Sequence, residues 1–256
     1  MPFSDSESDK TAKYRAPALE KGLDVLELLA AAKAPLTLSQ ISTRLDRSVS
    51  ELFRMVQVLE ARGYVGPSAR GDGFELTNKL FSLGISRGPN QNLLLSALPM
   101  MQELSEQTRQ ACHLVIASDD RMVVIARVEA PGDIGFSVRV GYQRPLCKST
   151  SGIILYAFQK PKVRESWRNH MRPTLTPEEW QEFDAQADRA VAQGFIAVKS
   201  GYAEGIIDVS CPIHNDVSVI AALTMPFIRS TESAGIEETT AHLRATAAAL
   251  SRSLGA

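Results

Sequence analysis

The chain has 256 residues, 44% hydrophobic and 22% charged, with a formal net charge of −1. Such a length can fill two hydrophobic cores, and the balanced charge excludes a general affinity for nucleic acid or membranes, so any DNA binding should be site-directed and salt-sensitive. No stretch approaches the ~20 apolar residues of a membrane span, there is no apolar signal core, and three widely spaced cysteines fit reduced thiols, so we expect a cytoplasmic protein.

The chain begins with a polar segment, residues 1–14, that we predict to be a disordered tail. Apolar residues over 18–32 recur at helical spacing, and Pro35 follows the end of that helix. Residues 15–77 are therefore predicted to form the first folded domain.

Two further short helices, over residues 37–45 and 49–63, are separated by a tight break at Asp46 and Arg47. One side of the second helix is apolar at the spacing i, i+3, i+4, i+7, which predicts its buried face: Leu52, Met55, Val56 and Leu59. The opposite side, predicted to face outward, carries Ser50, Phe53, Arg54 and Gln57. Both helices begin with capping-box patterns: Thr37 with Gln40, and Ser48 with Glu51.

Short strands are expected at residues 64–65 and 74–76, around a glycine-rich turn whose Arg70 can reach a phosphate. Helix, turn, helix and hairpin together indicate a winged helix-turn-helix that inserts its second helix into the major groove of double-stranded DNA. The DNA-binding candidates are Thr37, Arg47, Ser50, Glu51, Phe53, Arg54, Gln57 and Arg70. A protein-interaction module built on the same winged helix remains an alternative.

A linker helix is expected over residues 78–96, with a break at 88–90. The helix that resumes at residue 92 is predicted to bury a stripe of Leu95, Leu98, Met101 and Leu104, and Pro99 marks either a first turn or a kink.

The remainder, residues 97–256, alternates short apolar runs with helical periods. Strands are expected at residues 113–117, 122–128, 134–140, 195–198, 206–213 and 217–225, and helices at 151–159, 161–171, 176–194 and 236–254. This order predicts an α+β fold, an antiparallel sheet flanked by helices that serves as a sensor domain. The glycines match neither the P-loop nor the dinucleotide fingerprint, so no cofactor is expected.

Five stretches in this order resemble the IclR family of bacterial transcriptional regulators: ALEKGLDVLELL (18–29), PLTLSQI (35–41), LEARGYV (59–65), PLCKSTSG (145–152) and GIIDVSCP (205–212). The resemblance implies a winged helix-turn-helix domain, a GAF-like effector-binding and oligomerisation domain, and self-association as a dimer or tetramer. It further implies control of a catabolic operon by a small organic metabolite: an organic acid, or an aromatic or sugar-derived compound. It also implies the effector-binding residues Cys147, Ser149, Thr150, Ser151, Gly152, Asp208, Ser210 and Thr224. Val49, Glu51, Cys147 and Asp208 depart from common choices in the family, so neither operator sequence nor effector identity transfers.

The segment from Ser149 to Gly152 lies just ahead of an apolar helix, where hydroxyl and backbone N–H groups can bind a carboxylate. The alternative is that these residues only cap the helix. Asp208 would repel an anion unless it is protonated or bridged, so a neutral or hydroxyl-bearing effector stays open.

Cys211 and His214 raise the question of a metal site or a catalytic thiol. Residues three apart in a strand point to opposite faces, and no further ligand is spaced nearby, so we expect neither metal nor enzyme activity. The alternative to a regulator is an enzyme, a thiol-dependent hydrolase built on the second domain.

Overall fold

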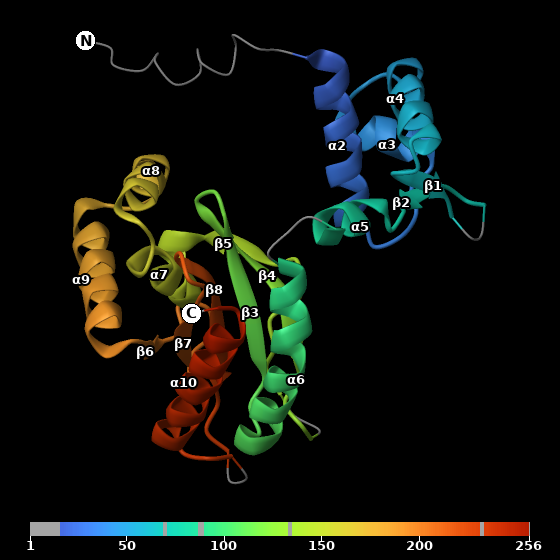
Figure 1. Cartoon of the computed structure of the whole chain (residues 1–256). Helices are drawn as coiled ribbons and strands as arrows, with labels where there is room; N and C mark the ends of the chain where they lie inside the picture. Colours follow the sequence, from blue (N-terminus) through green and yellow to red (C-terminus); the bar gives the residue numbers. More distant parts are fainter. Residues whose placement is uncertain (1–15, 69–70, 87–89, 133–134, 231–232, 256) are drawn as a thin grey trace, which may run out of the picture. The chain divides into compact units, whose positions relative to one another are not determined.

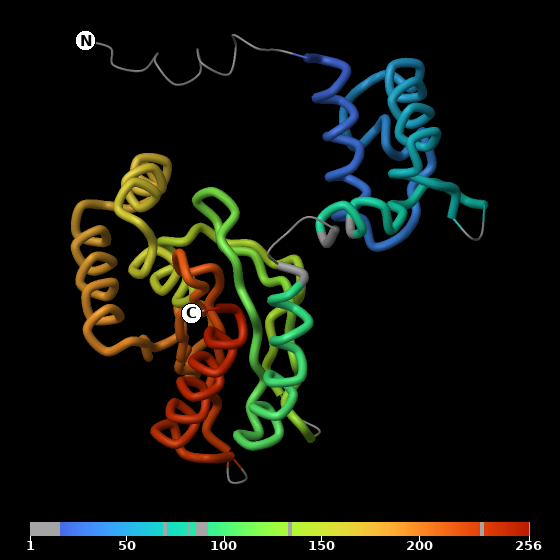
Figure 2. Tube along the Cα trace, in the orientation of Figure 1, coloured from blue at the N-terminus to red at the C-terminus, as the bar shows by residue number. Residues whose placement is uncertain are grey.

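The structure is a computed structural model that describes residues 16–68, 71–86, 90–132, 135–230 and 233–255 (Figures 1 and 2). The chain divides into two compact units, Met1–Gly88 and Pro89–Ala256. The predicted tail at residues 1–14 and the predicted phosphate contact Arg70 lie outside the described residues.

The first unit confirms the predicted winged helix-turn-helix. Its elements are α2 (Pro17–Ala31), α3 (Leu38–Leu45), α4 (Val49–Ala61), β1 (Val65–Pro67), β2 (Phe74–Leu76) and α5 (Lys79–Ser86). The two strands pair antiparallel, and Leu36 adds a bridge to Phe74. Side chains from the first three helices and from β1 meet in one small core that includes Val25, Ile41 and Leu52.

Local signals fix where the two short helices begin. Thr37 and Gln40 form the predicted capping box at α3, and Asp46 ends that helix in the left-handed conformation, with φ of 51°. Ser48 accepts a hydrogen bond from the backbone N–H of Glu51, which confirms one half of the second predicted box. The other half is wrong, because the Glu51 carboxylate pairs with Lys21 of α2 instead.

The second unit contains a six-stranded antiparallel sheet in the order β5-β4-β3-β8-β7-β6. The strands are β3 (Cys112–Ser118), β4 (Arg121–Val128), β5 (Gln143–Pro145), β6 (Ile196–Lys199), β7 (Ile207–His214) and β8 (Val219–Phe227). The helices are α6 (Asn90–Thr108), α7 (Thr150–Ala157), α8 (Pro161–Met171), α9 (Pro177–Gln193) and α10 (Ile236–Ser253), with 3-10 turns at Leu146–Lys148 and Arg172–Thr174. This architecture confirms the predicted α+β class.

Two hydrophobic cores lie on opposite faces of this sheet. Helices α6 and α10 cover one face, and α7 and α9 lie on the other (Figure 1). Because side chains alternate along a strand, Cys112 and Leu114 of β3 pack toward α6, while Val115 packs toward α7. This alternation decides which strand residues can reach a ligand on the α7 face.

The stripe predicted on α6 is partly wrong. Met101 and Leu104 are buried, but Leu95 is 68% exposed and Leu98 44% exposed, and the other buried hydrophobic residues of the helix are Leu93 and Ala97. The predicted residues are spaced three apart throughout, so they drift around a helix that has 3.6 residues per turn. The buried residues Leu93, Ala97, Met101 and Leu104 are spaced by four, four and three, which keeps them on one side of the helix. Pro99 lies inside the helix rather than in its first turn.

The predicted strand at residues 134–140 is also wrong over its described part, 135–140, which is irregular. Backbone hydrogen bonds join Val124 of β4 to Gly141 and Tyr142, so the chain rejoins the sheet later and pairs as β5. Among the described residues, no helix is long and apolar enough to cross a membrane.

Candidate functional site

The outward face of α4 is the candidate DNA-reading surface. Ser50, Phe53, Arg54 and Gln57 are all exposed, as predicted, while Leu52 and Val56 on the other side are buried. Phe53 is 47% exposed, so its ring is open to contact with a partner. A helix held in this way at the second position of a helix-turn-helix can enter the major groove and present these side chains to base edges.

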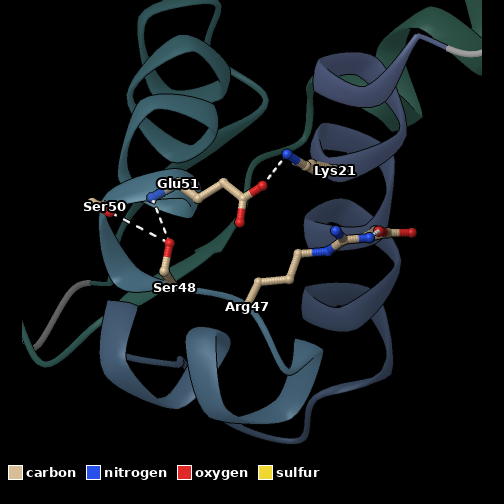
Figure 3. Close-up of polar contacts among 6 residues, drawn as sticks. Lys21, Arg47, Ser48, Ser50 and Glu51 are labelled. Atoms are coloured by element: carbon tan, nitrogen blue, oxygen red, sulfur yellow. Dashed lines mark hydrogen bonds and ion pairs between the residues drawn. The ribbon is translucent and has the colours of Figure 1, made fainter.

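Three other predicted contacts have partners within the unit. Glu51 pairs with Lys21 of α2 (Figure 3). Arg47 donates to the carboxylate of Asp24, on the same helix, at 3.1 Å. The hydrogen bond and charge of Lys21 lower the pKa of Glu51, so this carboxylate stays ionised. Thr37 caps α3. Arg47 and Glu51 thus hold the start of α4 against α2, and any contact with DNA would be additional to that role.

A cavity of about 600 Å³ lies on the α7 side of the sheet. Six of the eight predicted effector-binding residues line it: Cys147, Ser149, Thr150, Ser151, Asp208 and Thr224. The structure thus gathers three segments, residues 147–151, Asp208 and Thr224, around one space. The other two predicted residues, Gly152 and Ser210, do not line it.

At the start of α7, one residue caps the helix and the next two have free backbone donors. The Ser149 hydroxyl accepts from the Gly152 N–H at 3.1 Å, so Ser149 is the cap. Within the described part of the chain, the backbone N–H groups of Thr150 and Ser151 have no hydrogen-bond partner. Two unpaired donors at the positive end of a helix can bind an anionic group.

The two predicted residues outside the lining, Gly152 and Ser210, contact residues of the cavity wall or of the turn before α7. A Cβ atom at Gly152 would stand 2.1 Å from the carbonyl oxygen of Leu146, so only glycine lets α7 begin this close to the preceding turn. The Ser210 hydroxyl lies 2.7 Å from that of Thr224, and both residues are buried.

Asp208 faces the cavity with a polar neighbour. The Thr150 hydroxyl donates to its carboxylate at 3.2 Å. Burial raises the pKa of Asp208, while hydrogen bonds from Ser200 and Thr150 and the charge of Arg144 act in the opposite direction. The raised pKa moves this residue toward the protonated form, which removes part of the repulsion expected for an anionic ligand.

Several residues that were not predicted from the sequence give the cavity its positive charge and its aromatic surface. Among the described residues, the cavity lining includes a single carboxylate, Asp208, and four basic side chains: Arg139, Arg144, Lys148 and Lys199. Lys148 is paired with Glu179 at 2.7 Å. Phe136, Tyr142 and Tyr202 add aromatic surface, and the two tyrosine rings meet edge to face at 6.3 Å. These residues come from separate loops and strand ends, so no local pattern marks them.

The cysteines are poor nucleophiles. All three are buried free thiols, and burial raises the pKa of Cys112 and of Cys211 to about 12. Burial is also the main influence on the Cys147 thiol, whose pKa is raised. A thiolate is therefore disfavoured at each position, which weighs against the thiol-dependent hydrolase. The described residues include no group of His, Cys, Asp and Glu that could hold a metal ion.

Comparison with known proteins accounts for both units. Residues 18–67 match the IclR helix-turn-helix domain, and residues 89–252 match the family described as bacterial transcriptional regulator IclR C-terminal. The HTH-type transcriptional regulator KdgR of Escherichia coli is 26% identical over 85% of this chain and 85% of its own length. KdgR of Dickeya chrysanthemi is 29% identical over 76% of this chain and 66% of its own length. The Escherichia coli repressor AllR is 24% identical over 88% of this chain and 86% of its own length.

Solved structures share the fold. An IclR homolog from Microbacterium hydrocarbonoxydans, crystallised with 4-hydroxybenzoate, aligns with a TM-score of 0.78 at 21% identity, covering 93% of this chain and 98% of its own. Pseudomonas aeruginosa HmgR aligns with a TM-score of 0.75 at 21% identity, covering 94% and 100% of the two chains. The chain therefore belongs to the IclR family of bacterial transcriptional regulators, with a helix-turn-helix DNA-binding domain followed by an effector-binding domain.

Proposed function

We propose that a small organic acid binds in the α7-side cavity and changes the affinity of the protein for its DNA operator. The observation that carries this proposal is the polarity of the cavity. Basic side chains and the unpaired N–H groups at the start of α7 converge on one space, and the lining carboxylate, Asp208, has a raised pKa. These features favour an anion, and the aromatic lining favours an acid with an apolar body.

One solved structure of the same fold supports this class of ligand. The Microbacterium hydrocarbonoxydans homolog was crystallised with 4-hydroxybenzoate, an aromatic acid. A cavity of about 600 Å³ has room for a molecule of this size together with water. We propose aromatic and aliphatic carboxylic acids as the effector class.

Operator binding is proposed to use the outward face of α4. Arg54 and Gln57 can donate to base edges or phosphates, and Ser50 lies near the N-terminal end of the helix, which usually enters the groove first. The wing and the start of α3 would add phosphate contacts through Arg70 and Thr37. Such contacts fix the register of the protein on the duplex.

Self-association as a dimer or tetramer is part of the proposal. Apolar side chains remain exposed on helices of both units: Leu19 and Leu23 on α2, and Leu95 and Leu98 on α6. A two-fold arrangement of helix-turn-helix domains matches operators whose half-sites are ~10 bp or a multiple of this apart. Analytical ultracentrifugation of the wild type and of Leu95→Glu tests this point, and a monomeric wild type at micromolar concentration would contradict it.

The test of the effector proposal uses the full-length protein and thermal shift against benzoate, phenylacetate, succinate and butyrate. Binding to the folded state must raise the melting temperature by mass action. The variant Arg144→Gln should lose most of the shift, because it removes one cation from the cavity wall. Arg172→Gln, an exposed residue in the 3-10 turn after α8, serves as the matched control and should behave as the wild type.

Acids that bind should also change the affinity for operator DNA selected from random duplexes, measured by fluorescence anisotropy. Two results oppose the proposal: no acid stabilises the wild type, or Arg144→Gln and Arg172→Gln respond alike.

A further inference from the structure

His113 is a buried polar residue that the family resemblance did not assign. It lies on β3, is 6% exposed, and lines the α7-side cavity. Its neighbours Cys112 and Leu114 point to the opposite face of the sheet, into the core under α6 and α10. Strand alternation therefore turns the imidazole toward the cavity.

The residues around His113 form a polar row across three adjacent strands. His113 is in register with Thr224 of β8, and Thr224 is in register with Ser210 of β7. Thr224 and Ser210 satisfy each other through hydroxyl oxygens 2.7 Å apart. The imidazole of His113, at the end of the row, forms no hydrogen bond with the described residues, although the backbone of His113 pairs with the neighbouring strands. Because the imidazole lines the cavity, a ligand or water in that space can supply its hydrogen-bond partner.

The imidazole is uncharged at neutral pH. Burial lowers the pKa of His113 to about 4. A neutral imidazole offers one N–H donor and one nitrogen acceptor, which suits a hydroxyl or carbonyl group. It supplies no charge to balance a carboxylate. The anionic end of a ligand is better placed at the start of α7, where Thr150 and Ser151 leave their N–H groups unpaired.

We infer that His113 is a ligand-contacting residue of the cavity and forms a hydrogen bond with an uncharged oxygen of the effector, remote from the carboxylate that binds at α7. The inference rests on the proposed function and narrows it: the effector is an acid that carries a hydroxyl or oxo group. His113 then selects hydroxylated or oxidised acids over their plain parents, because a parent acid leaves the imidazole unpaired.

The test compares matched acids by isothermal titration of the full-length protein. The pairs are benzoate with 4-hydroxybenzoate, phenylacetate with 4-hydroxyphenylacetate, succinate with malate, and butyrate with 3-hydroxybutyrate or 2-oxobutyrate. In at least one pair, the wild type should bind the oxygenated member about 10-fold or more tighter than the parent. His113→Phe should reduce that preference to about 2-fold or less while keeping the affinity for the parent acid, and His113→Gln, which retains donor and acceptor groups, should recover part of it.

Two further measurements separate a lost contact from a lost fold. His170→Phe makes the same substitution at an exposed position on α8 and should leave all affinities unchanged. In the wild type with ¹⁵N-labelled histidine, the ring nitrogen resonances of His113, assigned through His113→Gln, should shift on saturation with the preferred acid.

The possible failures are distinguishable. If no acid binds the wild type, the proposed function fails and the inference with it. If acids bind with equal preference in the wild type and in His113→Phe, or the His113 ring resonances do not respond to a saturating acid, the proposed function stands and the role of His113 is overturned.

Discussion

The carboxylate of Glu51, on the first turn of α4, forms an ion pair with the amine of Lys21 on α2 (Figure 3). A second pair, Arg47 with Asp24, joins the turn before α4 to the same helix. The recognition helix is thus held at its N-terminal end, the end that approaches DNA first, by charges on the first helix of the unit.

Removing the Glu51 charge should weaken this attachment. We expect Glu51→Gln and Lys21→Met to lower the melting temperature slightly, and the double variant to lower it by less than the sum, because either change alone breaks the pair. The coupling should shrink in high salt, since the pair is solvent-accessible. Circular dichroism melts in low and high sodium chloride measure it, and strictly additive effects at low salt would show that the pair contributes nothing.

Replacing Arg54 by Ala should remove operator binding without unfolding the protein. Arg54 is exposed and forms no ion pair with the described residues, so its loss affects only the DNA-reading surface. If Arg54 contacts a base, affinity should fall by about 1–3 kcal/mol and discrimination at one operator position should relax. Arg252→Ala removes the same charge from α10 and is the control for net charge. Unchanged affinity and footprint would take Arg54 off the interface.

The substitution Gly152→Ala should destabilise the effector-binding domain. The new Cβ would meet the Leu146 carbonyl at 2.1 Å, and backbone cannot rotate away as a side chain can. We expect a loss of about 2 kcal/mol or more, together with weaker acid binding, because the start of α7 must shift. Gly22→Ala, within α2, has open space around the new methyl and should instead stabilise by about 0.5–1 kcal/mol. Urea denaturation compares the two, and equal effects would show that the close approach at Gly152 is relieved.

Stability should fall on acidification through His113. Because burial lowers the folded-state pKa to about 4, the unfolded chain binds more protons between that value and the ordinary value of 6.5. The contribution of His113 to the free energy of unfolding is therefore fully present above pH 6.5 and is lost as the pH falls. The loss amounts to about 2 kcal/mol between pH 7 and pH 5.

The variant His113→Gln should flatten that dependence. His214, whose pKa is also lowered by burial, keeps part of the slope, and Asp208, with its raised pKa, contributes with the opposite sign. The difference in pH dependence between wild type and variant isolates His113. If the free energy of unfolding from urea titrations changes equally in both proteins between pH 7 and pH 5, the pKa of His113 is the same in the folded and unfolded states.

Much of the first unit follows from local chemistry that can be read in the sequence. Thr37 with Gln40 and Ser48 with the Glu51 N–H fix two helix starts, and the apolar period of α4 fixes which side is buried. What local reasoning could not supply is the partner of the Glu51 carboxylate. Lys21 lies 30 positions away, and only the packing of α2 against α4 brings it within reach.

In the second unit, too, local sequence predicted most of the elements but not the long-range contacts between them. The positions of most strands and helices were readable from periodicity, but the α6 stripe was misassigned because several three-residue spacings compete in a leucine-rich helix. Residues 135–140 carry an apolar pattern that resembles a strand, yet Phe136 and Val138 line the cavity instead. A strand needs a partner edge as well as a pattern, and here Gly141 and Tyr142 hold the position beside Val124.

The sequence by itself determined the family, the two-unit order, the outward face of the recognition helix and six of the residues around the cavity, because these depend on neighbours a few positions apart or on stretches shared with relatives. Only the tertiary structure decided the chemistry of that cavity. Arg139, Arg144, Lys199 and His113 come from a loop and three different strands, and the antiparallel pairing of β4 with β5, of β3 with β8, and of β7 with β6 and β8 brings their segments around one space. Long-range strand pairing sets which charges meet, and no local pattern in the chain encodes it.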